Sequence, residues 1–370
     1  MQNTTRQPLE RNSMTKPGPA RDATVADVAR RAGVSKAQAA RALGAYGSVS
    51  EAVLTSVQAA AKELGYHPNH VAKSMNTGRS HTVGVVVGDI ENPYFGRVVR
   101  GISDAVRERG YNVMLVNSDE QLAAEQEAVR ALLDMRVDGL IVAPASAETS
   151  DHLRDAQARG RALVLFDRGA PGIEADLISV DFQAASAAST QQLIDAGHER
   201  IAYISSLRST TPYAPGKDLG QSPVSQRIGG IEAALANAGL RLDPALVRLN
   251  AVDPAAVESA VDFLLTLAEP PTAFVASDNM IAQSLFGALI DRGLSVPGDC
   301  SFVMYDDFPW TLLTTPPLTV IRQPVYEMGV EAGRRIVDRI EGKTPGPMPD
   351  LEAAVISRGS IAPPRKLPPS

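Results

Sequence analysis

Short apolar runs alternate with longer helical segments from His81 onward, and this alternation constrains the fold more than any other feature of the sequence. The first run, residues 82–87, reads Thr-Val-Gly-Val-Val-Val, as expected for a strand buried on both faces. Strands that alternate with helices predict parallel sheets covered by helices on both faces. Because the alternation restarts at Arg200, the prediction is an α/β body of two lobes, each a doubly wound parallel sheet. The expected strands cover residues 82–87, 112–116, 139–142, 163–166, 200–204, 273–276 and 301–305, with helices over 95–109 and 123–135.

The segment before this body is predicted to be all-α. Residues 1–22 lack apolar periodicity, so we expect a disordered extension there. Gly33 should end a first helix, because a tight reversal needs a residue that tolerates positive φ. Two short helices joined by this turn and braced by a third describe a helix-turn-helix unit over residues 23–66. Each helix is opened by a side chain that can cap its first turn: Thr24 with Asp27, Ser35 with Gln38, and Ser50.

The charge of the chain is divided unevenly. Residues 1–80 contain eleven Lys and Arg against five Asp and Glu, a balance of +6, whereas the remaining 290 residues contain 25 against 37, a balance of −12. This division indicates a polyanionic partner for the amino-terminal segment alone, although a solvated basic tail would carry the same charge. In a helix-turn-helix unit the second helix enters the major groove, where Lys36 and Arg41 would face bases and the small Ala37 would allow close approach.

Several motifs in one order resemble those of the LacI/GalR family of bacterial transcription repressors. They are Thr24-Val25-Ala26-Asp27-Val28-Ala29, Ala32-Gly33-Val34-Ser35, Leu64-Gly65-Tyr66, and Pro68-Asn69 with Ala72. The resemblance extends to about residue 362, and several motifs in the same order are more specific than any one of them. It implies double-stranded operator DNA as a partner and a homodimer. It also implies a body like the periplasmic sugar-binding proteins over residues 81–362, followed by a tail over 363–370.

The resemblance further implies a hinge helix and linker over residues 67–80. In the family this short helix pairs with that of the dimer mate and inserts a leucine into the minor groove, and the matching position here is Met75. A helix of about eight residues is too short to be stable alone in water, so it should form only on DNA. The residues expected to contact DNA are Thr24, Ser35, Lys36, Ala37, Arg41, Asn69, Ala72 and Met75.

Polar residues follow the carboxyl ends of the predicted strands, where ligands bind to open parallel sheets. Carboxylates and guanidinium groups beside aromatic rings suit a polyhydroxylated ligand. The alternative is that the Asp residues cap the following helices, an interpretation that we favour for Asp278 and not for Asp167, Arg168 and Asp306. The set comprises Asp89, Asn92, Tyr94, Phe95, Asp167, Arg168, Arg227, Ser277, Asp278, Asp306 and Asp307.

The family resemblance narrows this set. Asn92-Pro93-Tyr94-Phe95 is similar to a segment of the periplasmic sugar-binding proteins, and in the pentose binders residues matching Asp167-Arg168, Arg227 and Asp306 contact sugar hydroxyls. Ser277 departs from the usual Asn, and residues 207–226 are longer than the family norm. No aromatic residue lies near Val252, where many members stack one, and Trp310 is a candidate for that ring. The expected effector-binding residues are Asn92, Tyr94, Phe95, Asp167, Arg168, Arg227, Ser277 and Asp306.

No catalytic, metal-binding or membrane-spanning motif competes with this interpretation. One cysteine and five histidines without metal-ligand spacing predict neither a disulfide framework nor a metal site, and Cys300, beside an apolar strand, should be a buried structural thiol. The chain has no GxSxG elbow and no Gly-rich phosphate loop, so we expect no enzyme and no cofactor. It has no apolar run of about 18 residues, which excludes a membrane partner.

The main prediction is a cytoplasmic, homodimeric repressor whose operator binding is controlled by a small sugar-like effector in the cleft between the lobes. One alternative is a purine- or nucleoside-responsive regulator of the same family. The other, from a different class, is a sugar-binding transport protein, against which the helix-turn-helix unit and the polar first 23 residues argue. No heptad helix follows Pro349, so a coiled-coil tetramer is not expected.

Overall fold

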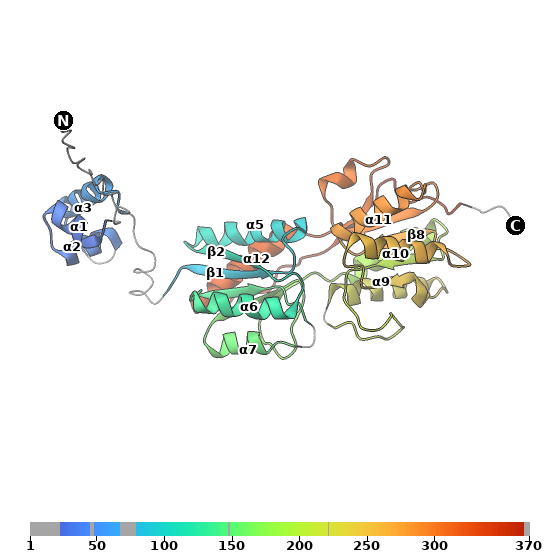
Figure 1. The fold of residues 1–370 in the computed structure, drawn as a ribbon, viewed down its shortest axis with the longest axis horizontal. Coiled ribbons are helices and arrows are strands. Elements are labelled where there is room, and N and C mark those ends of the chain that lie inside the picture. The colour runs from blue at the N-terminus through green and yellow to red at the C-terminus, as the bar shows by residue number, and fades with distance from the viewer. Residues whose placement is uncertain (1–22, 45–47, 67–78, 147–148, 221, 366–370) are drawn as a thin grey trace, which may run out of the picture. The chain divides into compact units, whose positions relative to one another are not determined.

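A computed structural model describes residues 23–44, 48–66, 79–146, 149–220 and 222–365 (Figure 1). The chain divides into two compact units, Met1–Gly78 and Arg79–Ser370. The predicted extension over 1–22 and residues 366–370 of the predicted tail lie outside the described residues. So does nearly all of the predicted hinge, residues 67–78, with Asn69, Ala72 and Met75.

The first unit contains the three helices that the capping signals predict. Thr24 and Asp27 form the expected reciprocal capping box, Ser35 and Gln38 form the second, and the Ser50 hydroxyl accepts from the Val53 N–H. Gly33 ends the first helix with φ of 68°. The helices bury a small core that includes Val28, Ala39 and Val57. They are α1 (Val25–Ala32), α2 (Lys36–Gly44) and α3 (Glu51–Glu63).

The second unit begins with a five-stranded sheet whose strands are all parallel and run in the order β2-β1-β3-β4-β5. Neighbouring residues of β1 point to opposite faces, so Val85 packs with one cluster of buried residues and Val86 with another. Helices α5 (Pro93–Glu108) and α12 (Val325–Ile340) cover the first face, and α6 (Leu122–Asp134) and α7 (Asp151–Ala158) cover the second. The strands are β1 (Thr82–Val87), β2 (Asn112–Asn117), β3 (Gly139–Val142), β4 (Ala162–Phe166) and β5 (Asp176–Ile178).

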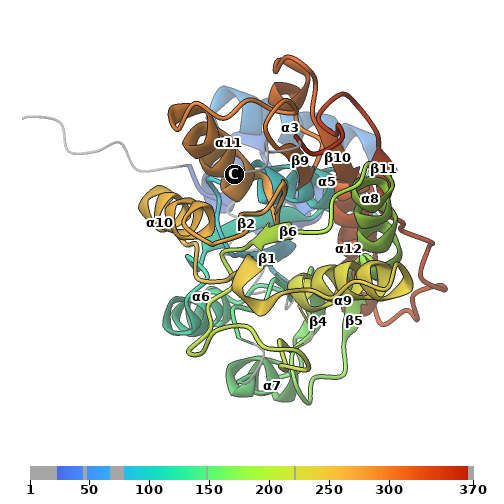
Figure 2. The ribbon, with the colours of Figure 1, turned by 90° about the vertical axis from the view of Figure 1, so that its right-hand side faces the viewer.

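The second sheet has the order β11-β10-β9-β8-β6-β7. Helices α8 (Gln183–Asp195) and α9 (Pro223–Asn237) lie side by side on one face, and α10 (Pro254–Leu265) and α11 (Asn279–Asp291) cover the other (Figure 2). Short 3₁₀ turns occupy η1 (Pro244–Leu246) and η2 (Pro309–Leu312). The strands are β6 (Ile201–Ile204), β7 (Val247–Arg248), β8 (Ala273–Ala276), β9 (Ser301–Tyr305), β10 (Thr319–Arg322) and β11 (Ala354–Ile356).

The second sheet is parallel, as predicted, except at one edge. Strand β11 pairs with β10 in the antiparallel direction, because the chain reaches this edge by returning from α12 rather than through a crossover helix of the same sheet. The second lobe also begins earlier than Arg200, since α8 already packs against α9, β10 and β11.

Helix α12 follows the second sheet in the sequence but packs on the first. Glycines make this close packing possible: a Cβ on Gly101 of α5 would lie 2.3 Å from the Tyr326 carbonyl oxygen, and one on Gly329 would lie 2.2 Å from that of Val98. The chain therefore passes between the sheets after β5, after β10 and before β11. Among the described residues, no helix has both the length and the apolarity to cross a membrane.

Candidate functional site

The carboxyl ends of β1 and β4 bring Tyr94 and Asp167 together. Asp167 directly follows β4, takes a left-handed backbone with φ of 67°, and donates its N–H to the Ile178 carbonyl of the next strand at 2.9 Å. Tyr94 lies in the first turn of α5, and its hydroxyl donates to Oδ1 of Asp167 at 2.9 Å. Two residues that are 73 positions apart thus form one partly buried pair at this edge of the sheet.

Arg168 is held by two carboxylates. Its Nη1 and Nη2 donate to the two carboxylate oxygens of Glu120 at 2.7 and 3.1 Å, and its Nε approaches Oδ2 of Asp167 at 3.4 Å. Burial disfavours the charged guanidinium, but Glu120 and Asp167 outweigh burial and raise the pKa of Arg168. Arg168 therefore stays charged and oriented.

Arg227 enters the site from α9, in the second lobe. Its guanidinium carbon lies 4.2 Å from the ring centres of both Phe182 and Tyr305, a cation–π arrangement on two rings. Nη1 donates to the Ser277 carbonyl oxygen at 2.6 Å, while the buried Nε has no partner among the described residues. Such an unpaired donor is costly to bury, so this arrangement is suited to a ligand that accepts a hydrogen bond.

Asp306 follows β9 as Asp167 follows β4. It has φ of 76°, donates its N–H to the Ile321 carbonyl at 2.9 Å, and accepts from Nε2 of Gln323 at 2.6 Å. Burial raises the pKa of Asp306 to about 7, with Arg227 opposing the rise. The carboxyl group is therefore poised to titrate near neutral pH.

The charged groups of the two lobes act on one another. Burial lifts the pKa of Tyr94 well above its usual range, Asp167 and Asp306 raise it further, and Arg227 lowers it. Burial also disfavours charge on Arg227, but the surrounding tyrosines and these two carboxylates raise its pKa. Side chains from both sheets thus form one electrostatic cluster.

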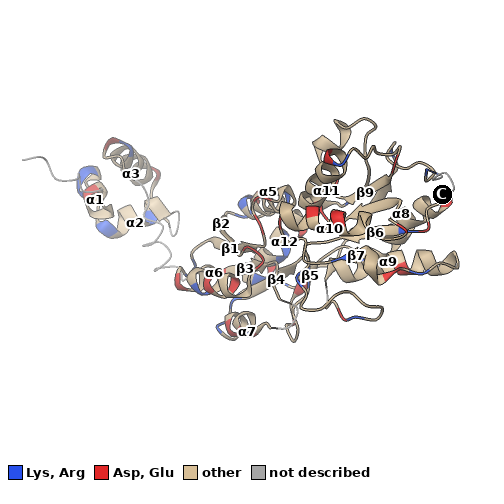
Figure 3. Cartoon of the chain, turned by 45° about the vertical axis from the view of Figure 1, so that its right-hand side comes forward, with Lys and Arg blue, Asp and Glu red and all other residues tan. Residues whose placement is uncertain are grey.

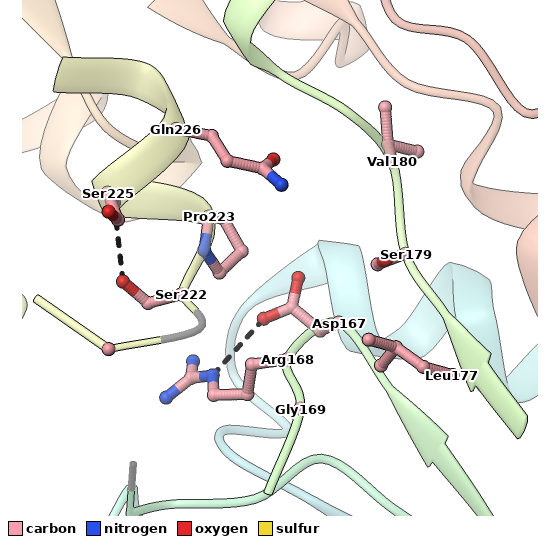
Figure 4. Close-up of a pocket in the computed structure, with 11 residues that line it drawn as sticks. Asp167, Arg168, Gly169, Leu177, Ser179, Val180, Ser222, Pro223, Ser225 and Gln226 are labelled. Atoms are coloured by element: carbon pink, nitrogen blue, oxygen red, sulfur yellow. Dashed lines mark hydrogen bonds and ion pairs between the residues drawn. The ribbon is translucent and has the colours of Figure 1, made fainter. Parts of the chain in front are cut away.

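A pocket of about 300 Å³ lies beside this cluster, and Figure 4 shows its lining. Asp167 and Arg168 line it from the first lobe, and the amino-terminal turn of α9 lines it from the second, with Ser222, Ser225 and Gln226. The side-chain oxygen Oε1 of Gln226 accepts from the Phe182 N–H at 3.0 Å, which ties α9 to the segment that connects the lobes. Hydroxyl, amide, carboxylate and guanidinium groups together can hydrogen-bond a polyhydroxylated ligand.

Other residues of the expected effector set have different roles in the structure. The Asn92 side chain caps α5 by accepting from the Tyr94 N–H, and the Ser277 hydroxyl donates to Asp278, so Ser277 offers Arg227 only its carbonyl. Phe95 packs in the core beside Tyr94. Trp310 does not line the described pocket: its indole N–H donates to Asn279, and its ring packs near Phe286.

Two expectations about single residues are confirmed. Asp278 caps α11 by accepting from the N–H groups of Met280 and Ile281. Cys300 is buried, and this burial raises the pKa of its thiol to about 12. A thiol with so high a pKa is a poor nucleophile at neutral pH.

The sequence interpretation did not include several residues that the structure places in the cluster. Gln323 lies one residue beyond β10, a strand that was not predicted, and Tyr305 was assigned only as a strand residue. Gln226 immediately precedes Arg227, a predicted residue, but was not itself predicted. The missed residues are Glu120, Phe182, Gln226, Tyr305 and Gln323.

In the first unit, helix α2 carries Lys36 and Arg41 among small residues and no acidic residue (Figure 3). Lys36, Ala37 and Arg41 are exposed, whereas Ala39 and Ala42 face the core. Neither Lys36 nor Arg41 forms an ion pair with another described residue, so both charges are available to a partner. Thr24 and Ser35 use their hydroxyls in the capping boxes described above.

Comparison with known proteins gives two family matches that together span most of the chain. Residues 24–69 match the model of bacterial regulatory proteins of the lacI family, and residues 80–352 match that of periplasmic binding proteins and the sugar binding domain of the LacI family.

Individual proteins agree with these matches. The ribose operon repressor of Escherichia coli is 32% identical over 324 residues, which cover 87% of this chain and 94% of the relative. A LacI family transcriptional regulator from Enterococcus faecium, solved with bound ribose, is 26% identical with a TM-score of 0.65 and covers 77% of this chain and 100% of its own. The lac repressor dimer bound to operator and an anti-inducer shares the fold, with a TM-score of 0.77 at 22% identity, over 92% of this chain and 100% of its own.

Proposed function

Because the chain belongs to the LacI family of bacterial regulatory proteins, we propose that it represses transcription as a homodimer whose operator binding is set by a small sugar. The chain is a DNA-binding transcriptional regulator with a helix-turn-helix unit and a body of the sugar-binding type. The proposed division is 23–66 for DNA binding, 67–80 for the hinge, and 81–362 for effector binding and dimerisation. Such a regulator acts in the cytoplasm, where its DNA is, and needs no catalytic group.

The observation that carries the sugar proposal is the cluster of charged and aromatic groups drawn from both lobes. Asp167 and Arg168 reach the pocket from one sheet, and Arg227 and Asp306 lie beside it on the other. A volume of about 300 Å³ is at the small end for ligand pockets, which suits a monosaccharide. Ribose is the sugar named for two of the similar proteins, and a pentose is therefore the first effector to test.

Each side chain of the expected effector set has a proposed role. Asp167, Arg168, Arg227 and Asp306 hydrogen-bond sugar hydroxyls, with the carboxylates accepting and the guanidinium groups donating. Tyr94 and Phe95 provide apolar ring surface, Asn92 fixes the start of α5, and the Ser277 carbonyl holds Arg227 in place. Gln323 keeps Asp306 oriented.

Operator recognition is assigned to the first unit. Lys36, Ala37 and Arg41 approach the major groove from the exposed side of α2. Thr24 and Ser35, which precede α1 and α2, contact the phosphate backbone of the DNA. Asn69, Ala72 and Met75 remain predicted DNA contacts in the hinge. A two-fold dimer would read a near-palindromic site of about twenty base pairs.

Control by the sugar follows from its contacts with two lobes. A ligand bonded to both favours the arrangement in which both sets of contacts form, and it shifts the equilibrium only by its differential affinity for the two states. The hinge adjoins the first lobe in sequence. A change in the arrangement of the lobes therefore changes the positions of the two hinge segments, which must pair on DNA. The sugar therefore acts as a switch of operator affinity.

The test is a thermal-shift measurement with D-ribose, other free sugars and nucleosides on the full chain. A specific sugar should raise the melting temperature of the wild type by mass action. Arg227→Ala and Asp306→Asn should each weaken that sugar about tenfold or more, because each removes a charge-assisted hydrogen bond in a desolvated site.

Arg248→Ala is the matched control. Arg248 also stacks on an aromatic ring, 4.3 Å from the centre of Phe263, and also has a buried Nε without a described partner, but it belongs to β7 and does not line the pocket. Its loss should leave sugar affinity unchanged. Equal losses in Arg227→Ala and Arg248→Ala, or stabilisation by nucleosides and by no sugar, would refute the proposed site.

A further inference from the structure

Glu120 does not line the described pocket, but it contacts Arg168, which does, and no hydroxyl-binding role requires this carboxylate. It lies on the turn after β2 and pairs end-on with Arg168, with both carboxylate oxygens within 3.1 Å of the two Nη atoms. This fork-to-fork geometry is the strongest arrangement between a guanidinium and a carboxylate. The Nη1 and Nη2 edge of the Arg168 guanidinium, which best binds an anion, is thus already occupied by Glu120.

The backbone around Glu120 is built to place it there. Asp119 and Glu120 both have left-handed conformations, with φ of 51° and 54°, which cost free energy in residues other than glycine. The Glu120 N–H donates to the Gly88 carbonyl at 3.1 Å, and the buried Ser118 donates both its N–H and its hydroxyl to the Val87 carbonyl. The turn is therefore fastened to the end of β1.

Gly88 completes this placement. A Cβ at position 88 would lie 2.1 Å from Oε1 of Glu120, so the glutamate side chain occupies the space that any other residue at 88 would fill. A strained turn, its anchoring bonds and a glycine all serve to bring one carboxylate onto Arg168.

The consequence is a site without excess positive charge. Arg168 and Arg227 are faced by Asp167, Glu120 and, when it is ionised, Asp306. An anionic ligand would have to displace Glu120 from Arg168 and would then lie close to two or three carboxylates. Repulsion between like charges at such distances lowers affinity by more than about tenfold.

We propose that Glu120 is a specificity-determining residue that restricts the effector to uncharged sugars and rejects phosphorylated ones. The proposal rests on the proposed sugar site and names the class of sugar that it accepts. Arg168 keeps its remaining N–H groups for hydroxyl oxygens, while Glu120 acts as its permanent anionic partner.

The test compares Glu120→Gln with wild type for three probes: D-ribose, D-ribose 5-phosphate and inorganic phosphate. Calorimetric titration of the full chain should give wild type at least about a tenfold preference for D-ribose over its phosphate. Glu120→Gln should reduce this preference about tenfold or more and should allow inorganic phosphate to raise the melting temperature. A merely structural role of Glu120 would weaken all ligands together and leave the preference unchanged.

Asp119→Asn is the matched control, since it removes the same charge from the same turn but its exposed side chain contacts Asn117 and not Arg168. The preference of Asp119→Asn for D-ribose over D-ribose 5-phosphate should equal that of wild type. Stabilisation of wild type and Glu120→Gln by phosphate to the same extent would overturn the proposal, as would an equal effect of Asp119→Asn. If D-ribose does not bind wild type, the pentose assignment fails, and the phosphate comparison still decides the role of Glu120.

Discussion

Two aspartates, one in each lobe, occupy equivalent and unusual backbone positions. Asp167 and Asp306 each follow a central strand, each has positive φ, and each donates its N–H to the next strand at 2.9 Å. Left-handed backbone in residues other than glycine persists where surrounding structure enforces it, often at ligand sites. The two sheets thus present matching carboxylates, and burial raises the pKa of Asp306 to about 7.

We predict that Asp306 makes folding stability depend on pH. Its pKa is raised to about 7 in the folded protein, against an ordinary value of 3.8, so the folded state holds this proton more tightly than the unfolded state. The associated stability is complete below about pH 4 and is lost as the pH rises through about 7. Asn cannot ionise, so Asp306→Asn does not lose this stability. The difference between its free energy of unfolding and that of wild type should therefore increase by a few kcal/mol as the pH rises through this window.

Denaturant unfolding of both proteins at a series of pH values measures this difference. The comparison at each pH cancels the titration of all other groups. If the two stability curves run parallel between about pH 4 and pH 8, Asp306 is ionised throughout and the prediction fails.

At the scale of elements, helix α2 carries the side chains expected to read bases. We predict that Arg41→Ala costs roughly 1–3 kcal/mol at the cognate operator and relaxes preference at one base pair, because an arginine fork recognises guanine through two hydrogen bonds. The operator can be selected from a random duplex library and binding measured by fluorescence anisotropy. Lys62→Ala, on the exposed side of α3, removes the same charge as a control. Equal losses for Arg41→Ala on operator and on random DNA would show that Arg41 contacts only phosphate.

The contact of α5 with α12 gives a second prediction at this scale. A Cβ on Gly329 would lie 2.2 Å from the Val98 carbonyl oxygen, so Gly329→Ala must push the helices apart and should destabilise the body by about 1–3 kcal/mol. Gly96, also in α5, has no neighbour within 4 Å of an added Cβ. Gly96→Ala should therefore be neutral or stabilise the body by up to about 1 kcal/mol, since alanine favours helix. Denaturant midpoints measure both, and a neutral Gly329→Ala would contradict the packing argument.

The elements also show which parts of the fold could be read from the sequence. Strands β1, β3, β8 and β9 have the predicted bounds, because strands buried on both faces form continuous apolar runs. Strands β5, β7 and β11 were missed because they are edge strands of two or three residues, too short for a pattern. The antiparallel β11 forms because the chain returns from α12 to the second sheet, and no local sequence pattern predicts that return.

The candidate site divides in the same way. Asp167, Arg168, Arg227 and Asp306 were predictable because they follow strands or lie near the start of a helix in recognisable motifs. Glu120 was not, because its position depends on a left-handed turn and on the absence of a side chain at Gly88. Phe182 lies in the segment between the lobes, where the sequence has no periodicity.

At the scale of the whole body, one cluster of buried residues runs through both lobes. It includes Val85 of β1, Tyr203 of β6 and Ile336 of α12, so the lobes share a core as well as three chain connections. Lobes that share a core should unfold together rather than one after the other.

We predict that a substitution in the first lobe lowers the midpoint measured in the second. Trp310 is the single tryptophan of the chain and packs near Phe286 beside α11, so its fluorescence reports on the second lobe. Gly329→Ala, on the first lobe, should lower the Trp310 midpoint as much as it lowers the midpoint from circular dichroism. If the fluorescence midpoint stays at the wild-type value while that from dichroism falls, the lobes unfold independently.

Because α12 packs on the first lobe, that lobe can be completed only after nearly the whole chain has been synthesised. Helix α5 leaves the ribosome roughly 220 residues before α12 does, and β4 leaves it about 160 residues before α12, an interval of about 8 to 45 s at typical rates of translation. During that time Val98, Ile102 and the apolar face of β3 and β4 lack their cover. We therefore expect chaperones to bind a nascent chain of this protein until its last helix emerges, and a chain that stops before Val325 lacks elements of both lobes.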